Sequence, residues 1–176
     1  MGDIIEDGYQ ALLDRINTAK EKIATSSEAI QNEEALLLDR MVTMTAPLVK
    51  EIGLSLLRRG KTDTKGEVYD AEYYKQKMIA LGKTDPAAIQ PGDMAKKITD
   101  QFCILGEDGV LYELMYSSDG FFIDSYLNPL TPADARATYG NEPAFMLYHA
   151  MKQYLQGQEE LVCALEKTLN FIHGSH

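Results

Sequence analysis

The sequence predicts a mostly helical α+β protein, in which a long N-terminal helix or pair of helices and a long C-terminal helix pack with a three-stranded antiparallel β-meander. Apolar residues recur at alternating steps of three and four near both ends of the chain. Between residues 102 and 127 the period changes to two, with two Asp-Gly turns. A chain of 176 residues with 45% hydrophobic and 25% charged residues has the composition of one folded soluble domain, with or without an appendage.

Residues 3–24 are predicted to form a helix with a coiled-coil seam. Thr25-Ser26-Ser27-Glu28 offers a capping box, so either a second helix starts there or one helix continues. Residues 33–58 are helical and apolar over a wide arc, which requires neighbours on more than one side. Pro47 is expected to kink or split this helix, and Arg58-Arg59-Gly60 to end it. The seam of the first helix consists of Ile5, Tyr9, Leu12, Ile16, Ala19 and Ile23.

Turn signals punctuate the stretch from residue 61 to 101. Residues 61–66 are predicted to form a loop, and Asp70 to cap a short helix that runs to Leu81. Asp85-Pro86 indicates another short turn, which Pro91-Gly92 breaks. A helix capped by Asp93 is expected to continue to about residue 101.

The meander is predicted from three strand-like runs at 102–105, 110–116 and 121–127. The segments 106–109 and 117–120 separate these runs, and both end in Asp-Gly, which is typical of tight hairpin turns.

Two helices are expected to close the chain. Thr131 or its neighbours can cap a short helix that ends at Tyr139 before Gly140, and the last helix is predicted from Pro143 to about Ile172. The two heptad seams at the ends of the chain are most simply buried against each other or against copies of themselves. The C-terminal seam consists of Ala144, Tyr148, Met151, Leu155, Gln158, Val162, Leu165, Leu169 and Ile172.

The aromatic residues divide the chain into segments. Of the fifteen Phe and Tyr residues, only Tyr9 precedes residue 69. Because aromatic side chains bury a large area, a globular core usually contains them. Residues 1–60 are therefore predicted to be a coiled-coil-like helical segment and 61–173 a globular α+β part. Residues 174–176 have the sequence of an expression-tag remnant.

The charge of the chain bears on its partners and compartment. The formal net charge is −10, and residues 101–176 carry ten acidic and three basic residues. A negative surface repels phosphate backbones and anionic lipids, so neither nucleic acid nor a membrane is expected as a partner. The acidic N-terminus lacks the features of a signal peptide, and two cysteines sixty residues apart do not make a disulfide scaffold. These features predict a cytoplasmic protein.

The common motifs of catalysis are missing from the sequence. Gly60-Lys61-Thr62 and Gly82-Lys83-Thr84 lack the earlier glycine of a phosphate-binding loop. No Gly-x-Gly-x-x-Gly, Gly-x-Ser-x-Gly or Cys-x-x-Cys occurs, and no metal or cofactor is expected. An enzyme is the least favoured hypothesis, and its site would have to assemble from His149, Glu113, Asp124 and Tyr112.

Two hypotheses for function remain. The first is a non-enzymatic interaction or assembly module that forms a homo-oligomer through its heptad-patterned helices, with a different protein as an alternative partner. The second is a small-molecule-binding or sensory domain with a tyrosine-lined pocket between sheet and helices, since tyrosine combines apolar area with a polar tip. The candidate ligand-binding residues are Tyr112, Tyr116, Tyr126, Tyr148 and His149.

Overall fold

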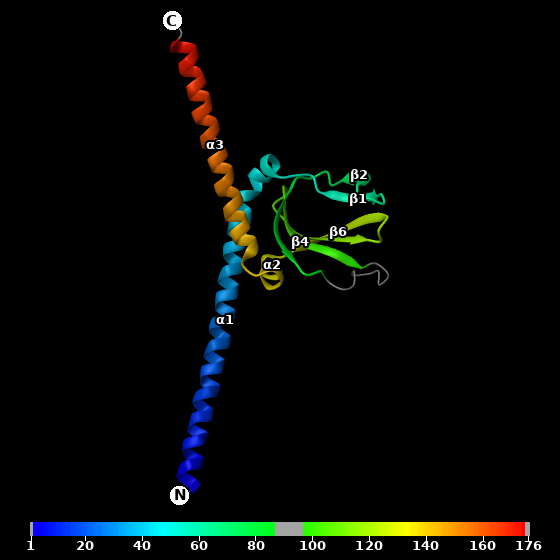
Figure 1. Ribbon diagram of the computed structural model, residues 1–176. Helices are drawn as coiled ribbons and strands as arrows, with labels where there is room; N and C mark the ends of the chain where they lie inside the picture. Colours follow the sequence, from blue (N-terminus) through cyan, green and yellow to red (C-terminus); the bar gives the residue numbers. More distant parts are fainter. Residues whose placement is uncertain (1, 87–96, 175–176) are drawn as a thin grey trace.

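The computed structural model describes residues 2–86 and 97–174. Within them, a curled β-sheet lies on one side of a long rod that two helices build (Figure 1). The elements follow one another as α1 (Gly2–Ile52), β1 (Leu57–Thr62), β2 (Val68–Tyr73), β3 (Met78–Thr84), β4 (Ile98–Gly106), β5 (Leu111–Ser118), β6 (Phe122–Leu130), α2 (Pro132–Tyr139) and α3 (Glu142–Gly174).

The six strands form one antiparallel sheet in the order β2-β1-β6-β5-β4-β3. The predicted fold class, with a three-stranded meander, is therefore wrong. The three predicted strands exist as β4, β5 and β6, but β3 extends the sheet at one edge and β1 with β2 at the other. The physical reason is long-range pairing, because β1 pairs with β6 and aligns Arg59 with Asp124. No local pattern records a partner sixty-five positions away.

Three strands lie where the sequence predicts other structure. β1 includes Gly60, which was expected to end a helix, and the segment predicted as a helix capped by Asp70 forms β2 and β3. Gly60 is buried, and a Cβ at its position would lie 2.9 Å from a methyl group of Val68 across the strand pair. The helix expected at 93–101 is also wrong in its described part, because β4 begins at Ile98. Its first residues and the break at Pro91-Gly92 lie outside the described residues.

The N-terminal region forms one continuous helix, which resolves the alternative left open at residues 25–28. α1 has 51 residues and contains Pro47 without being split. The helix ends at Ile52 rather than Arg58, because the chain enters the sheet there: the Leu54 N–H donates to the Met78 carbonyl oxygen over 2.9 Å. Gly53 allows this close passage, since a Cβ at its position would lie 2.5 Å from the Val49 carbonyl oxygen.

The two C-terminal helices confirm their predicted signals. Thr131 caps α2 by accepting a hydrogen bond from the Asp134 N–H over 3.1 Å, and Gly140 ends the helix with a φ of 65°. α3 then runs for 33 residues from Glu142.

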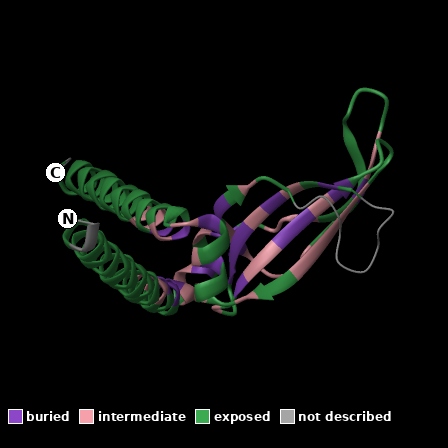
Figure 2. Cartoon of the chain, turned by 90° about the horizontal axis from the view of Figure 1, so that it is seen from below, coloured by how far each residue is buried: buried purple, intermediate pink, exposed green. Residues whose placement is uncertain are grey.

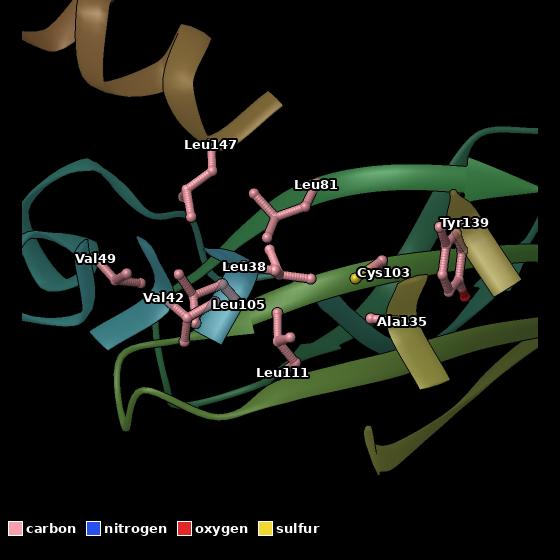
Figure 3. Close-up of a cluster of buried hydrophobic side chains, with 10 residues drawn as sticks. All are labelled: Leu38, Val42, Val49, Leu81, Cys103, Leu105, Leu111, Ala135, Tyr139 and Leu147. Atoms are coloured by element: carbon pink, nitrogen blue, oxygen red, sulfur yellow. The ribbon is translucent and has the colours of Figure 1, made fainter. Parts of the chain in front are cut away.

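The main core lies between the helices and one face of the sheet (Figure 3). α1 contributes Leu38, Val42 and Val49, α3 contributes Leu147, and α2 contributes Ala135 and Tyr139. The strands contribute Leu81, Cys103, Leu105 and Leu111. This core fixes the sheet to the middle of the rod.

A second, smaller core lies on the opposite face of the sheet. Met78, Ile104 and Leu114 are buried there, and the Phe102 and Tyr116 rings meet edge to face with centroids 6.2 Å apart. Leu56 and Tyr74, from the segments that flank β1 and β2, pack against this cluster. The curl of the sheet thus lets the sheet cover part of its own second face.

Burial is confined to the sheet and to the parts of the helices beside it (Figure 2). The outer lengths of α1 and α3 are exposed on all sides. In spite of their length, none of the helices among the described residues is apolar enough to cross a bilayer.

Candidate functional site

Two helical arms project from the body of the molecule. We define the α1 arm as residues 4–33 and the α3 arm as residues 155–174, in which every residue is exposed. At 1.5 Å per residue, the arms are about 45 Å and about 30 Å long. They point in opposite directions from the level of the sheet, so that the N- and C-termini lie at the two ends of the rod (Figure 1).

An apolar stripe runs along α1 at intervals of seven residues. The stripe continues beyond the seam predicted for residues 3–24, through the whole arm and on to the part of α1 beside the sheet. Its members are exposed to between 46% and 69%. These members, which we call the α1 stripe, are Tyr9, Ile16, Ile23, Ile30, Leu37 and Met44.

A corresponding stripe runs along the α3 arm. Its members are exposed to between 54% and 58% and continue the seam that begins beside the sheet. We call this set the α3 stripe, and it comprises Leu155, Val162, Leu165, Leu169 and Ile172.

The two stripes do not bury each other within the chain. α1 and α3 meet beside the sheet, where the side chain of Asn141, directly before α3, donates to Glu34 over 3.1 Å and the Tyr154 hydroxyl of α3 donates to Glu51 over 2.6 Å. The second of these bonds raises the pKa of Tyr154. Because the arms point in opposite directions, the expected packing of the N-terminal seam against the C-terminal seam cannot occur within one chain.

An ion pair lies where the α1 arm joins the body. The Arg136 guanidinium of α2 donates to the Glu34 carboxylate over 2.5 Å, and both side chains are about three-quarters buried. The Arg136 hydrogen bond, helped by the one from Asn141, holds the pKa of Glu34 below its usual range. This cluster connects α1 to α2 at the point where the α1 arm begins.

A cleft at the end of the sheet remote from the rod is the second candidate site. Its volume is about 660 Å³, which is within the range of small-molecule pockets. Its lining comes from β1, β2, the β5–β6 hairpin and Lys97, which precedes β4, and includes Arg59, Lys61, Asp70 and Glu72.

Four of the charged side chains that line this cleft form ion pairs with one another. Lys61 forms an ion pair with Asp70 at 2.7 Å, and Arg59 with Glu72 at 3.5 Å. The Lys61 bond lowers the pKa of Asp70, and the same bond raises the pKa of Lys61. A ligand with its own charge would therefore have to compete with pairs that are already formed.

The predicted ligand-binding residues lie in three different places. Tyr112 and Tyr116 alternate on β5 and share the face of the second core, where the Tyr112 hydroxyl donates to Asp108 and the Tyr116 hydroxyl to the Leu57 carbonyl oxygen. Burial, mainly, raises the pKa of each tyrosine to about 12. Tyr126 aligns with Met115 and so points to the other face of the sheet, while Tyr148 and His149 are exposed on α3.

The groups considered for catalysis do not converge either. Glu113 lies on the helix-covered face, where it accepts hydrogen bonds from Gln101 at 2.5 Å and Tyr139 at 3.4 Å. Tyr112 is on the opposite face, Asp124 lines the cleft and His149 is on α3. The buried Cys103 thiol has its pKa raised to about 12 by burial, which suppresses the thiolate.

The cleft and the part of the α1 stripe that follows Ile23 were not predicted from the sequence. The signal for the stripe was present, because Ile30, Leu37 and Met44 continue the seven-residue interval of Ile23. The signal for the cleft was weaker, because β1 and β2 are short and were predicted as loop and helix.

No protein-family model, curated protein or solved structure matches the chain, so the proposals below rest on the geometry alone.

Proposed function

We propose that the chain is an assembly module that self-associates through the apolar stripes of its two arms and carries out no reaction of its own. The observation that carries this proposal is the α1 stripe, which extends over about 50 Å of helix. Monomeric soluble proteins rarely expose a long contiguous apolar patch, and such patches mark interaction sites. Heptad spacing also indicates that the partner is a helix, since apolar residues at this spacing pack one helix along another.

The rest of the α1 arm supports the same function. Acidic residues recur at seven-residue intervals on the side of the helix opposite the stripe. One face is thus suited to a partner helix and the other to water, as in the strand of a coiled coil. The acidic series consists of Asp7, Asp14, Glu21 and Glu28.

The proposal is tested by placing charges in both stripes. We expect the wild-type chain to have the mass of an oligomer in sedimentation equilibrium. The double variant Ile16→Glu/Leu165→Glu should associate at least about a hundredfold more weakly, because each new carboxylate would be buried without a partner.

A matched variant separates this effect from a general effect of charge. Ala11→Glu/Ala164→Glu adds the same two charges to the same helices at exposed positions away from the stripes, and should keep the wild-type mass. Circular dichroism should show the same helix content for both variants. A wild-type chain that stays monomeric at the highest attainable concentration would refute the proposal.

A ligand-binding function is the second candidate, and the cleft of about 660 Å³ is the observation that favours it. This cleft is not the pocket predicted between sheet and helices, because the described residues between the sheet and the helices form the main core. Native mass spectrometry of the freshly purified chain tests this function. Extra mass that is lost on denaturation and absent from an Arg59→Ala variant would support a ligand in the cleft; retention by that variant would count against it.

A further inference from the structure

The α3 arm lacks a neighbour on the face that packs against the body at its start. Ala144 packs against the main core, and Met151, seven residues later, is partly buried. The same seven-residue series continues through Gln158, Leu165 and Ile172, but α1 ends at Ile52 and no described element lies beside these residues. The face of α3 that contacts the body thus continues along the arm as an exposed series in which Leu165 and Ile172 are apolar and Gln158 is polar, and a packed helix would cover it.

We propose that a second copy of this chain supplies the missing helix: its α1 arm packs antiparallel along the α3 arm, and a twofold axis repeats the contact at the other end of the rod. This inference rests on the proposed assembly function and specifies its geometry. A different protein as occupant is an outcome that the experiments below would reveal.

Charge complementarity favours pairing between unlike arms. Flanking positions next to a heptad seam select the partner through ion pairs. Beside the α1 stripe, between Leu12 and Ile30, the charged flanking residues are all basic: Arg15, Lys20 and Lys22. Beside the α3 stripe, the flanking residues Glu159 and Glu166 are acidic. In an antiparallel pair, the flank four residues after the seam on one helix meets the same flank of the other, so Lys20 of one copy lies next to Glu159 or Glu166 of another. Arg15 and Lys22 add positive charge on the far flank of the same contact.

The same charges oppose pairing between like arms. Two α1 arms would bring basic flanks together, and two α3 arms would bring Glu159 and Glu166 close to the same residues of the other copy. Like charges at such positions are destabilising. Pairing of unlike arms is therefore more stable than pairing of like arms, and this difference in stability selects the contact between the α1 arm and the α3 arm.

The directions of the helices favour a closed dimer. Within one chain α1 and α3 run the same way along the rod, because Glu34 lies beside Asn141 and Glu51 beside Tyr154. A twofold axis perpendicular to the rod reverses the second copy, and places each α1 arm beside the other copy's α3 arm (Figure 1). All four arms then have a partner, as in the closed symmetry that most homo-oligomers adopt. Near the axis, Leu37 and Met44 of the two α1 stripes face each other.

Charge reversal tests the choice of arms. We expect Arg15→Glu/Lys20→Glu/Lys22→Glu to weaken the dimer by about tenfold or more, and Glu159→Lys/Glu166→Lys to do the same. The chain that carries all five substitutions should regain an affinity within about threefold of the wild type, because opposite charges face each other again. If the chain with all five substitutions associates no better than the triple or the double variant, the pairing of unlike arms is overturned.

Carbodiimide crosslinking tests the contact directly. This reagent joins a lysine to a carboxylate only where the two are in contact. Because the two arms of one chain point away from each other, a crosslink from Lys20 to Glu159 or Glu166 has to join two copies. We expect such crosslinks in mixtures of isotopically labelled and unlabelled chains. Intermolecular crosslinks found only between α1 arms would contradict the proposal.

The mass of the assembly distinguishes the failure of this inference from that of the assembly function. Sedimentation equilibrium should give the mass of two chains. A series of masses that grows with concentration indicates head-to-tail packing and would overturn the twofold arrangement, although the assembly function would stand. A monomer, or a complex with a different protein only, would overturn both the second copy as occupant and self-assembly.

Discussion

The part of α1 beside the sheet and the part that projects from it share one heptad stripe, but only the part beside the sheet has a second apolar face. Beside the sheet, a series on an adjacent face is buried by the core: Leu38, Val42, Thr45 and Val49. Four heptads earlier, the same helical positions hold polar residues: Gln10, Asp14, Asn17 and Glu21. The part of α1 that is packed in its own chain therefore has two apolar faces, whereas the projecting arm has only one.

The largest expected effect contrasts two leucines of α3. Leu147 is fully buried in the main core, whereas Leu165 is 55% exposed on the arm. Leu147→Ala should lower the free energy of unfolding by about 2–5 kcal/mol, since it leaves a cavity. Leu165→Ala, measured by urea unfolding at concentrations where the chain is monomeric, should change it by less than about 0.5 kcal/mol. Equal losses for the two variants would mean that the arm packs within its own chain.

A smaller effect, of opposite sign in the two regions, is expected at two glycines. A Cβ at Gly53 would lie 2.5 Å from the Val49 carbonyl oxygen and 2.9 Å from the Met78 nitrogen, so Gly53→Ala should destabilise by about 1–3 kcal/mol. At Gly157, on the α3 arm, nothing lies within 4 Å, and alanine should stabilise the helix by about 0.5–1 kcal/mol. Thermal unfolding of both variants measures the contrast, and a gain at Gly53 would show that the entry into the sheet is loose.

The smallest effect concerns the junction between the two regions. Because its bond to Arg136 lowers the pKa of Glu34 in the folded chain, this carboxylate stabilises the fold above its unfolded pKa, near 4.5. That contribution is lost as the pH falls through the folded pKa. Glu34→Gln should therefore melt slightly below the wild type at neutral pH, and the difference should shrink as the pH falls below about 4.5.

The neighbouring residue provides the control for this pH dependence. Glu33→Gln removes the same charge from an exposed position one residue earlier, and its melting temperature should follow the wild type at every pH. If the Glu34→Gln difference were independent of pH, the Arg136 bond would not be its cause.

Predictions from the sequence succeeded where the signal is local. Thr131 and Gly140 bound α2 as expected, because a cap is made within one turn of helix. The two Asp-Gly turns lie between β4, β5 and β6 for the same reason. In contrast, the sequence does not indicate β1 and β2, because β1 pairs with β2 and with the distant β6, and the residues around Arg59 and Asp70 show no alternation of apolar and polar side chains.

The candidate sites followed the same division. The α1 stripe could be predicted from the sequence, because a seven-residue interval is a property of one helix. The tyrosines could not be placed, because the direction of each side chain depends on strand register: Tyr112 and Tyr126 come from neighbouring strands but lie on opposite faces. The cleft required β1, β2 and the β5–β6 hairpin to be assembled first.

The amino-acid pattern alone predicts a long helix near each end of this chain, each with an apolar stripe, and a formal net charge of −10. That the two stripes point to opposite ends of a rod and remain exposed is seen first in the folded chain. The reason is physical: helical periodicity is encoded within a few residues, whereas the direction of a helix depends on where the sheet places its ends. In this chain the main core joins the last part of α1 to the first part of α3, and so leaves the remaining length of each helix exposed.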